Sequence, residues 1–117
     1  MRFLCLAYGS ADDWKAMSTQ EQAEVLEQDE RIRNQGNFMA AVQTAVTTVT
    51  NWNGNLITTN ETYSMLSLPL AGFSIIEAKD VDEVIQLVAN SPCARAKGAV
   101  EIRPFWDFSE KSEGNGT

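Results

Sequence analysis

The sequence of 117 residues contains no histidine. This absence excludes Ser-His-Asp and Cys-His nucleophilic systems, and it removes the commonest transition-metal ligand of proteins. Cysteine is scarce as well, because Cys5 and Cys93 are the only two and lie far apart in the chain, which is no signature of a zinc site. The sequence also lacks a Walker loop, a G-x-G-x-x-G fingerprint and a calcium-binding loop. We therefore expect no metal and no cofactor.

Positive charge is sparse. Lys and Arg number 9 against 16 Asp and Glu, so the net charge at pH 7 is −7. The basic residues are scattered along the chain, whereas binding to duplex DNA or RNA needs a clustered basic face that neutralises phosphates. We therefore expect no nucleic-acid partner, and the acidic surface is most simply explained by solubility.

Long apolar runs are absent too. The apolar run within Met1–Tyr8 is shorter than the core of a secretory signal, and no other segment approaches the roughly 18 apolar residues of a membrane span. We expect a cytoplasmic protein with no membrane partner, in which both cysteines are reduced thiols.

The first half of the chain predicts a strand, a helix and a hairpin. The strand covers Phe3 to Tyr8, where apolar side chains occupy both alternating sets, as in strands buried on both faces. A capping box at Ser18–Glu21 predicts a helix to about Gln35, with Gly36 as its stop. The acidic residues of this helix, Asp29 among them, are expected to face solvent.

A hairpin is predicted next. Ala45–Trp52 is β-like and precedes Asn53-Gly54, a pair that tolerates the positive φ angles of a type I′ turn, and the returning strand is expected at Asn55–Thr59. The segment 60–69 has no clear periodicity and is predicted to be a loop. It is more apolar than a solvated connection needs, so it either closes over a ligand or packs on a partner subunit.

The second half predicts strand, helix and strand. Gly72–Ala78 forms the strand, Asp80 caps the helix, and the final strand is Ala99–Pro104. Side chains alternate along a strand, so Glu101 and Arg103 share one face of it.

This order of elements predicts the α+β class, with a ferredoxin-like βαββαβ fold and an extra β-hairpin. Two helices cover only one face of the sheet, yet the first strand is apolar on both faces. The uncovered face is expected to pack on the same face of a second copy, which gives a homodimer in the form of a dimeric α+β barrel. Residues 1–108 are expected to form this single domain, and the polar tail 109–117 is expected to be disordered.

Three groups of residues are candidates for a functional site. Glu101 and Arg103 would hold an anionic ligand or position a general base if they point into the barrel, and they form a weak surface ion pair if they point outward. The other two groups are aromatic and either line a pocket or pack at a subunit contact. They are Tyr8 and Trp14 with Asn60, Glu61 and Tyr63, and the cluster Phe105-Trp106-Asp107-Phe108.

Four segments in this order resemble the YCII-related family, specifically its DGPF branch: Arg2–Gly9 with Trp14, Leu70–Ala78, Asp80–Val84 and Val100–Pro104. The resemblance covers roughly residues 1 to 107 and implies a dimeric α+β barrel. The family's Asp-Gly-Pro-Phe segment aligns with Asn60-Glu61-Thr62-Tyr63, which keeps only the aromatic end. The resemblance also implies a His-Asp dyad in the wider family, and a chain without histidine has no such pair.

These observations leave three hypotheses for function. The leading one is a dimeric barrel that binds a small ligand or a protein partner without the family's dyad. The alternative is a small cofactor-free enzyme of the isomerase, lyase or monooxygenase-like kind, in which Glu101 or Glu61 acts as base and Tyr63 or Arg103 gives electrophilic support. The third is a purely structural dimerisation module.

Overall fold

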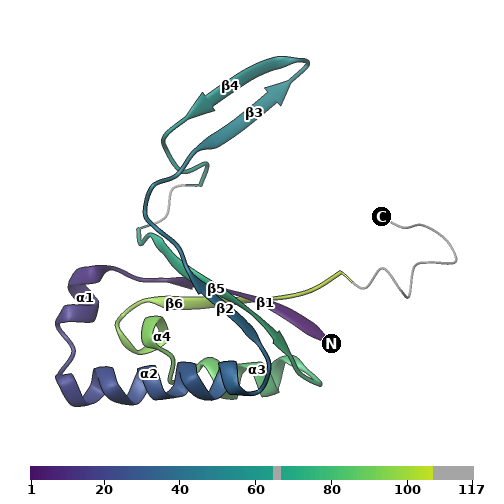
Figure 1. Cartoon of the computed structure of the whole chain (residues 1–117). Coiled ribbons are helices and arrows are strands. Elements are labelled where there is room, and N and C mark those ends of the chain that lie inside the picture. Colours follow the sequence, from purple (N-terminus) through teal and green to yellow (C-terminus); the bar gives the residue numbers. More distant parts are fainter. Residues whose placement is uncertain (65–66, 107–117) are drawn as a thin grey trace, which may run out of the picture.

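The structure is a computed structural model, and it describes residues 1–64 and 67–106 (Figure 1). Six strands and four helices follow one another in these ranges. In chain order they are β1 (Arg2–Tyr8), α1 (Ala11–Lys15), α2 (Thr19–Asn34), β2 (Phe38–Ala41), β3 (Thr48–Trp52), β4 (Asn55–Thr59), β5 (Leu70–Glu77), α3 (Val81–Val88), α4 (Pro92–Arg95) and β6 (Ala99–Pro104).

The main sheet has the strand order β2-β5-β1-β6, and every neighbouring pair in it is antiparallel. Helix α2 connects β1 to β2, and α3 with α4 connects β5 to β6. This is the predicted ferredoxin-like βαββαβ arrangement. The pair β3–β4 forms a second sheet of its own and is inserted between β2 and β5, so the predicted α+β class and the extra hairpin are both confirmed.

The two faces of the main sheet have different surroundings. Figure 1 shows the helices gathered below the sheet, and the hairpin rising on the opposite side. Phe3, Cys5 and Ile76 point to the helices and form the core with Ile32 and Val84, all of them buried. We call the opposite side the helix-free face. The alternating side chains, such as Leu4 and Ile75, lie there and are only half-buried in the single chain.

The predicted helix starts agree with the structure. The Ser18 hydroxyl accepts from the Glu21 amide at 3.0 Å while the Glu21 carboxylate accepts from the Ser18 amide at 3.1 Å, which completes the capping box. The Asp80 carboxylate accepts from the Glu83 amide at 2.9 Å. These bonds satisfy amides that a helix leaves without intrahelical partners. Gly36, just past α2, has φ = 94°, the conformation expected of a glycine stop.

The two short helices were not predicted. Ser10 caps α1 through its hydroxyl, which accepts from Asp13, and Pro92 stands at the start of α4. Helices of about one turn are too short to show a hydrophobic period, which explains both misses.

The hairpin has the predicted turn. Asn53 and Gly54 have φ angles of 55° and 80°, both positive as a type I′ turn requires. The two strands pair from Thr48 with Thr59 to Trp52 with Asn55. Within the described residues, no helix is long and apolar enough to cross a bilayer.

Candidate functional site

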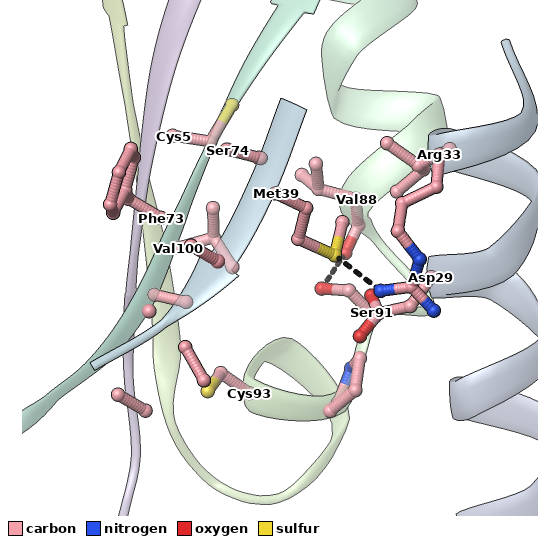
Figure 2. A pocket seen from close by; sticks show the side chains of 17 residues that line it. Cys5, Asp29, Arg33, Met39, Phe73, Ser74, Val88, Ser91, Cys93 and Val100 are labelled. Atoms are coloured by element: carbon pink, nitrogen blue, oxygen red, sulfur yellow. Dashed lines mark hydrogen bonds between the residues drawn. The ribbon is translucent and has the colours of Figure 1, made fainter. Parts of the chain in front are cut away.

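A cavity of about 270 Å³ lies between the main sheet and the helices (Figure 2). Helix α2 forms one wall, and the end of α3 together with α4 forms another. The sheet forms the third wall, to which all four of its strands contribute. The lining residues are Cys5, Ala7, Asp29, Ile32, Arg33, Met39, Ala40, Ala41, Ala71, Gly72, Phe73, Ser74, Val88, Ser91, Pro92, Cys93 and Val100.

Small residues create this space. On the helix-covered face, large side chains such as Phe3 and Ile76 pair across β1 and β5 at one end of the sheet. Toward the other end, Ala7 pairs with Gly72, and Gly72 pairs with Ala41 on β2. Three neighbouring strands therefore present a methyl group or a hydrogen atom where the core residues would otherwise continue.

Gly72 is required at its position for a second reason. A Cβ atom there would lie 2.6 Å from the carbonyl oxygen of Ala40, which is closer than real side chains approach backbone. The glycine therefore allows β2 and β5 to pair at the cavity wall.

The end of the cavity nearest α2 is polar. Figure 2 shows Asp29, Arg33 and Ser91 together at this end, whereas the Phe73 ring points away from the cavity. Arg33 forms an ion pair with Glu30 at 3.0 Å and donates to the Met39 sulfur at 3.4 Å. The Ser91 hydroxyl donates to the Val88 carbonyl at 2.6 Å.

Asp29 is the titratable carboxyl of the cavity. Burial raises its pKa, Arg33 counteracts part of that effect, and Glu30 adds to it. In the described part of the chain, no N–H or O–H group donates a hydrogen bond to this carboxylate. Its oxygens therefore remain available to a donor on a bound molecule. Asp29 was predicted to face solvent, and that prediction is wrong.

The two thiols at the cavity are not activated. Cys5 and Cys93 are both free. Burial raises the pKa of Cys93, and the charge of Asp29 raises it further. Burial also raises the pKa of Cys5, and a hydrogen bond with Ser74 lowers it by a smaller amount. Nucleophilic cysteines need a lowered pKa, so neither thiol has the properties of a catalytic nucleophile.

Some of the predicted site residues meet on the helix-free face. The Tyr8 hydroxyl donates to Glu101 Oε1 at 3.2 Å, and Arg103 Nη2 donates to the same oxygen at 3.5 Å. Burial and then the charge of Glu101 raise the pKa of Tyr8. Glu101 and Arg103 are exposed in the single chain, and the sheet separates this trio from the cavity.

The remaining predicted residues lie apart from both places. Asn60, Glu61 and Tyr63 are exposed after the hairpin, where the Glu61 carbonyl accepts from the Thr48 hydroxyl at 2.6 Å. Trp14 is half-buried in α1, and its carbonyl accepts from Gln22 at 2.8 Å. None of them lines the cavity.

The third candidate group is described only in part. The guanidinium of Arg2 lies 4.9 Å from the centre of the Phe105 ring. Phe105 does not line the cavity. Asp107 and Phe108 lie outside the described residues, as does the tail that was predicted to be disordered.

Sequence reasoning missed the residues of the polar end. One usable signal was present, namely Asp29 and Arg33 flanking the apolar Ile32 on one helix. That pattern places the charges beside the buried stripe, but it does not reveal that α2 faces a void rather than a filled core. The void depends on Ala7, Gly72 and Ala41 meeting across three strands, which only the register shows.

The fold and the cavity define a ferredoxin-like α+β domain with a ligand-sized space between its sheet and its helices. The family model of the YCII-related domain matches residues 1–109, and the chain belongs to this family. The DGPF branch stays a prediction.

A comparison with curated proteins gives no match. Among solved structures, the chain is similar to the 5-chloro-2-hydroxyhydroquinone dehydrochlorinase of Burkholderia phenoliruptrix AC1100 in complex with 2,5-dihydroxybenzoquinone. The two share 20% sequence identity over 94% of this chain and 98% of that chain, with a TM-score of 0.48.

Proposed function

We propose that this YCII-related protein binds a small, largely apolar molecule in the cavity between α2, α4 and the sheet. The observation that carries the proposal is a space of about 270 Å³ with apolar walls and one polar end, at which the Asp29 carboxylate accepts no hydrogen bond from the described residues. A cavity of roughly 150 Å³ already accommodates benzene. The size therefore suits a single ring with a few substituents.

The polar end restricts the chemistry of the ligand. The Asp29 carboxylate accepts hydrogen bonds, so the ligand carries a hydroxyl or N–H group at that end. Met39, Val88 and Val100 contact the rest of the molecule through apolar groups. A charge on that part of the ligand is disfavoured, because the apolar walls offer it no partner.

Binding without catalysis is the role that these residues favour. The chain has no histidine to form the family's His-Asp dyad, and both cavity thiols have raised pKa values. Recognition needs only the shape and the hydrogen-bond acceptor that the cavity offers. The protein is then a member of this family that binds a ligand without the dyad that the resemblance implies for the wider family.

The proposal is tested by native mass spectrometry of freshly purified protein, followed by ligand-observed NMR with a library of hydroxylated and amine-bearing single-ring compounds. Ala7→Leu fills the cavity and is expected to abolish binding, whereas Ala89→Leu adds the same volume at an exposed position and is expected to leave it unchanged. Asp29→Asn leaves the volume of the cavity nearly unchanged and is expected to weaken the binding of compounds that carry a hydroxyl. Equal binding by wild type and Ala7→Leu would contradict the proposal.

A cofactor-free enzyme is the second candidate, and Asp29 is the observation in its favour. A half-buried carboxylate with a raised pKa at the wall of a cavity is placed as a general base. It would take a proton from a carbon atom of the bound molecule and return it to another, which isomerises the ligand without a co-reactant. Glu101 and Glu61, the bases predicted from sequence, lie outside the cavity.

The two candidates are distinguished in deuterated water. An identified ligand is incubated with the protein, recovered and examined by NMR. Incorporation of deuterium by wild type and its loss in Asp29→Asn supports the enzyme, provided that the variant still binds. An unchanged ligand after binding supports the binding protein.

We propose a homodimer as the assembly, in which the helix-free face packs on the same face of a second copy. Its apolar side chains include Leu4, Leu6 and Ile75, which are only half-buried in the single chain, and Phe38, which is 57% exposed and lies 5.7 Å from the Phe73 ring between centroids. Apolar faces of this extent are typical of interfaces. Sedimentation velocity at micromolar concentration tests this, with Leu6→Lys expected to give monomers. A monomeric wild type would contradict it.

We also propose a cytoplasmic location, which rests on the free state of both cysteines. Recovery of the protein from cells with Cys5 or Cys93 in a disulfide would argue against it.

A further inference from the structure

The β3–β4 hairpin exposes large apolar side chains on both of its faces. Strand alternation and the pairing of Thr50 with Ile57 place Trp52 and Ile57 on one face, and Val49 and Leu56 on the other. Their exposed fractions are 71%, 48%, 58% and 64% in that order. Nothing in the described part of the chain covers either face.

The hairpin is also isolated in the fold. Neither strand makes more than sporadic contact with any other described helix or strand, and Figure 1 shows the pair standing away from the sheet. A single two-stranded hairpin is only marginally stable in water, and it needs a third strand or a packing surface. The ordered type I′ turn and full pairing therefore indicate an element that packs on something else.

The charge pattern distinguishes this hairpin from a solvated one. No charged residue occurs in the segment 34–60 of a chain that is 21% charged. Exposed strands in monomeric proteins normally carry lysines or other charges that prevent them from pairing with another chain. The absence of such residues over the whole hairpin and over the segment that leads into it indicates a surface that is covered in the assembled protein.

We propose that the β3–β4 hairpin is an arm that packs against a second copy of this chain. The arm rises on the helix-free side of the sheet (Figure 1), so both unpartnered apolar surfaces of the molecule lie on the same side. A two-fold arrangement buries both arms and both sheet faces at once, because each surface meets its counterpart on the other copy.

Charge supports a second copy as the occupant. The acidic residues of α2 and α3 lie on the helix side, where like charges keep two copies apart. On the helix-free face, Arg2 and Arg103 balance Glu77 and Glu101. An acidic chain can therefore approach its own copy through this side without net repulsion, and the uncharged arm adds none.

The inference rests on the proposed homodimer, and one set of sedimentation experiments separates the two. The arm variant combines Trp52→Lys with Leu56→Lys and places charge on both faces of the arm. Leu6→Lys places charge on the helix-free face of the sheet. Leu26→Lys is the control, at an apolar position of α2 that is 50% exposed. The arm variant is expected to raise the dimer Kd by more than roughly tenfold, as loss of a central interface residue does. The control is expected to leave it unchanged.

Hydrogen exchange provides a second measurement that does not depend on substitution. Amides of 48–59 are expected to exchange slowly at concentrations where the wild type is dimeric and rapidly after dilution to monomers. If the arm variant dimerises as tightly as wild type while Leu6→Lys is monomeric, the proposed contact of the arm is wrong and the dimer through the sheet face is supported. If the wild type remains monomeric, neither the homodimer nor the arm contact exists. If the hairpin amides are protected only when a different protein is added, the arm packs on that protein and not on a second copy of this chain.

Discussion

Asp29 and Cys93 line one cavity from two different helices, α2 and α4. Burial raises the pKa of the Cys93 thiol, and the negative charge of Asp29 raises it further. The carboxylate thus disfavours ionisation of the thiol beside it, which is the reverse of the arrangement that activates a nucleophile. The site is suited to recognition by shape and hydrogen bonding.

The first prediction concerns this pair. Asp29→Asn removes the negative charge, so the pKa of Cys93 falls, while burial keeps it above the ordinary value of 9.0. The rate of Cys93 alkylation by iodoacetamide is measured over a pH series by mass spectrometry of the peptide that contains Cys93. The midpoint of this pH profile is expected to lie at lower pH in Asp29→Asn than in wild type. Glu24→Gln removes a carboxylate from an exposed position of the same helix and serves as the control. An identical midpoint in wild type and Asp29→Asn would show that the two groups do not interact.

The second prediction is a pH dependence of stability caused by Asp29. Its pKa is raised in the folded protein above the ordinary value of 3.8, mainly by burial. Between these two pKa values the folded state binds more protons than the unfolded state, so stability falls as the pH rises through this window and the loss persists above it. Below both values no loss exists. Asp29→Asn is therefore expected to have a higher Tm than wild type at neutral pH, with a gain that shrinks as the pH is lowered. Thermal unfolding followed by circular dichroism over a pH series checks this, and a gain that grows toward low pH would contradict it.

The third prediction compares two neighbouring isoleucines on opposite faces of β5. Ile76 is 0% exposed in the core, so Ile76→Ala is expected to lower the free energy of unfolding by about 2–5 kcal/mol at any protein concentration. Ile75 lies on the helix-free face and is half-buried, so Ile75→Ala is expected to cost less in the monomer and to weaken the dimer. Urea unfolding at two protein concentrations measures both effects. Equal, concentration-independent losses would mean that the two faces are equally covered in the single chain.

Much of the fold was predictable because the signals are local. The Ser18 capping box, the Asp80 cap and the Asn53-Gly54 turn each depend on a few neighbouring residues, and all three are confirmed. The alternation on β6 correctly placed Glu101 and Arg103 on one face. Such features follow from backbone hydrogen bonding and from the period of a strand.

The cavity was not predictable, because it depends on register. Ala7, Gly72 and Ala41 are unremarkable in the sequence, and they create space only because three strands align them. Asp29 was assigned to solvent because its neighbours on α2 are acidic, whereas the structure turns its side chain toward the void. The residues predicted from sequence lie on the sheet, in α1 and in the loops, whereas α2 supplies Asp29 and Arg33 to the cavity.

The fourth prediction tests the start of α2, the helix whose C-terminal half lines the cavity. Ser18→Ala removes the acceptor for the Glu21 amide at the first turn of α2, and it is expected to lower the free energy of unfolding by about 1 kcal/mol. Thr19→Ala changes the next exposed hydroxyl without removing that bond and is the matched control. Urea unfolding with an unchanged m-value gives the difference. Equal stabilities of the two variants would mean that the capping bond contributes nothing.

The last prediction separates the two faces of the sheet in function. Tyr8 and Glu101 lie on the helix-free face, and neither lines the cavity. Tyr8→Phe and Glu101→Gln are therefore expected to leave ligand affinity in the cavity unchanged, while Asp29→Asn lowers it for ligands with a hydroxyl group. Because the Glu101–Arg103 pair is exposed at 3.5 Å, its loss is expected to cost the monomer no more than about 1 kcal/mol.

The same variants have a different effect on assembly. In a dimer closed through the helix-free face, Tyr8 and Glu101 lie inside the contact, so breaking their 3.2 Å hydrogen bond leaves a desolvated carboxylate with one donor fewer. Tyr8→Phe is therefore expected to raise the dimer Kd while ligand titrations by calorimetry overlay those of wild type. Loss of ligand binding in Tyr8→Phe, with the dimer intact, would place the functional site on the helix-free face and remove the cavity from the mechanism.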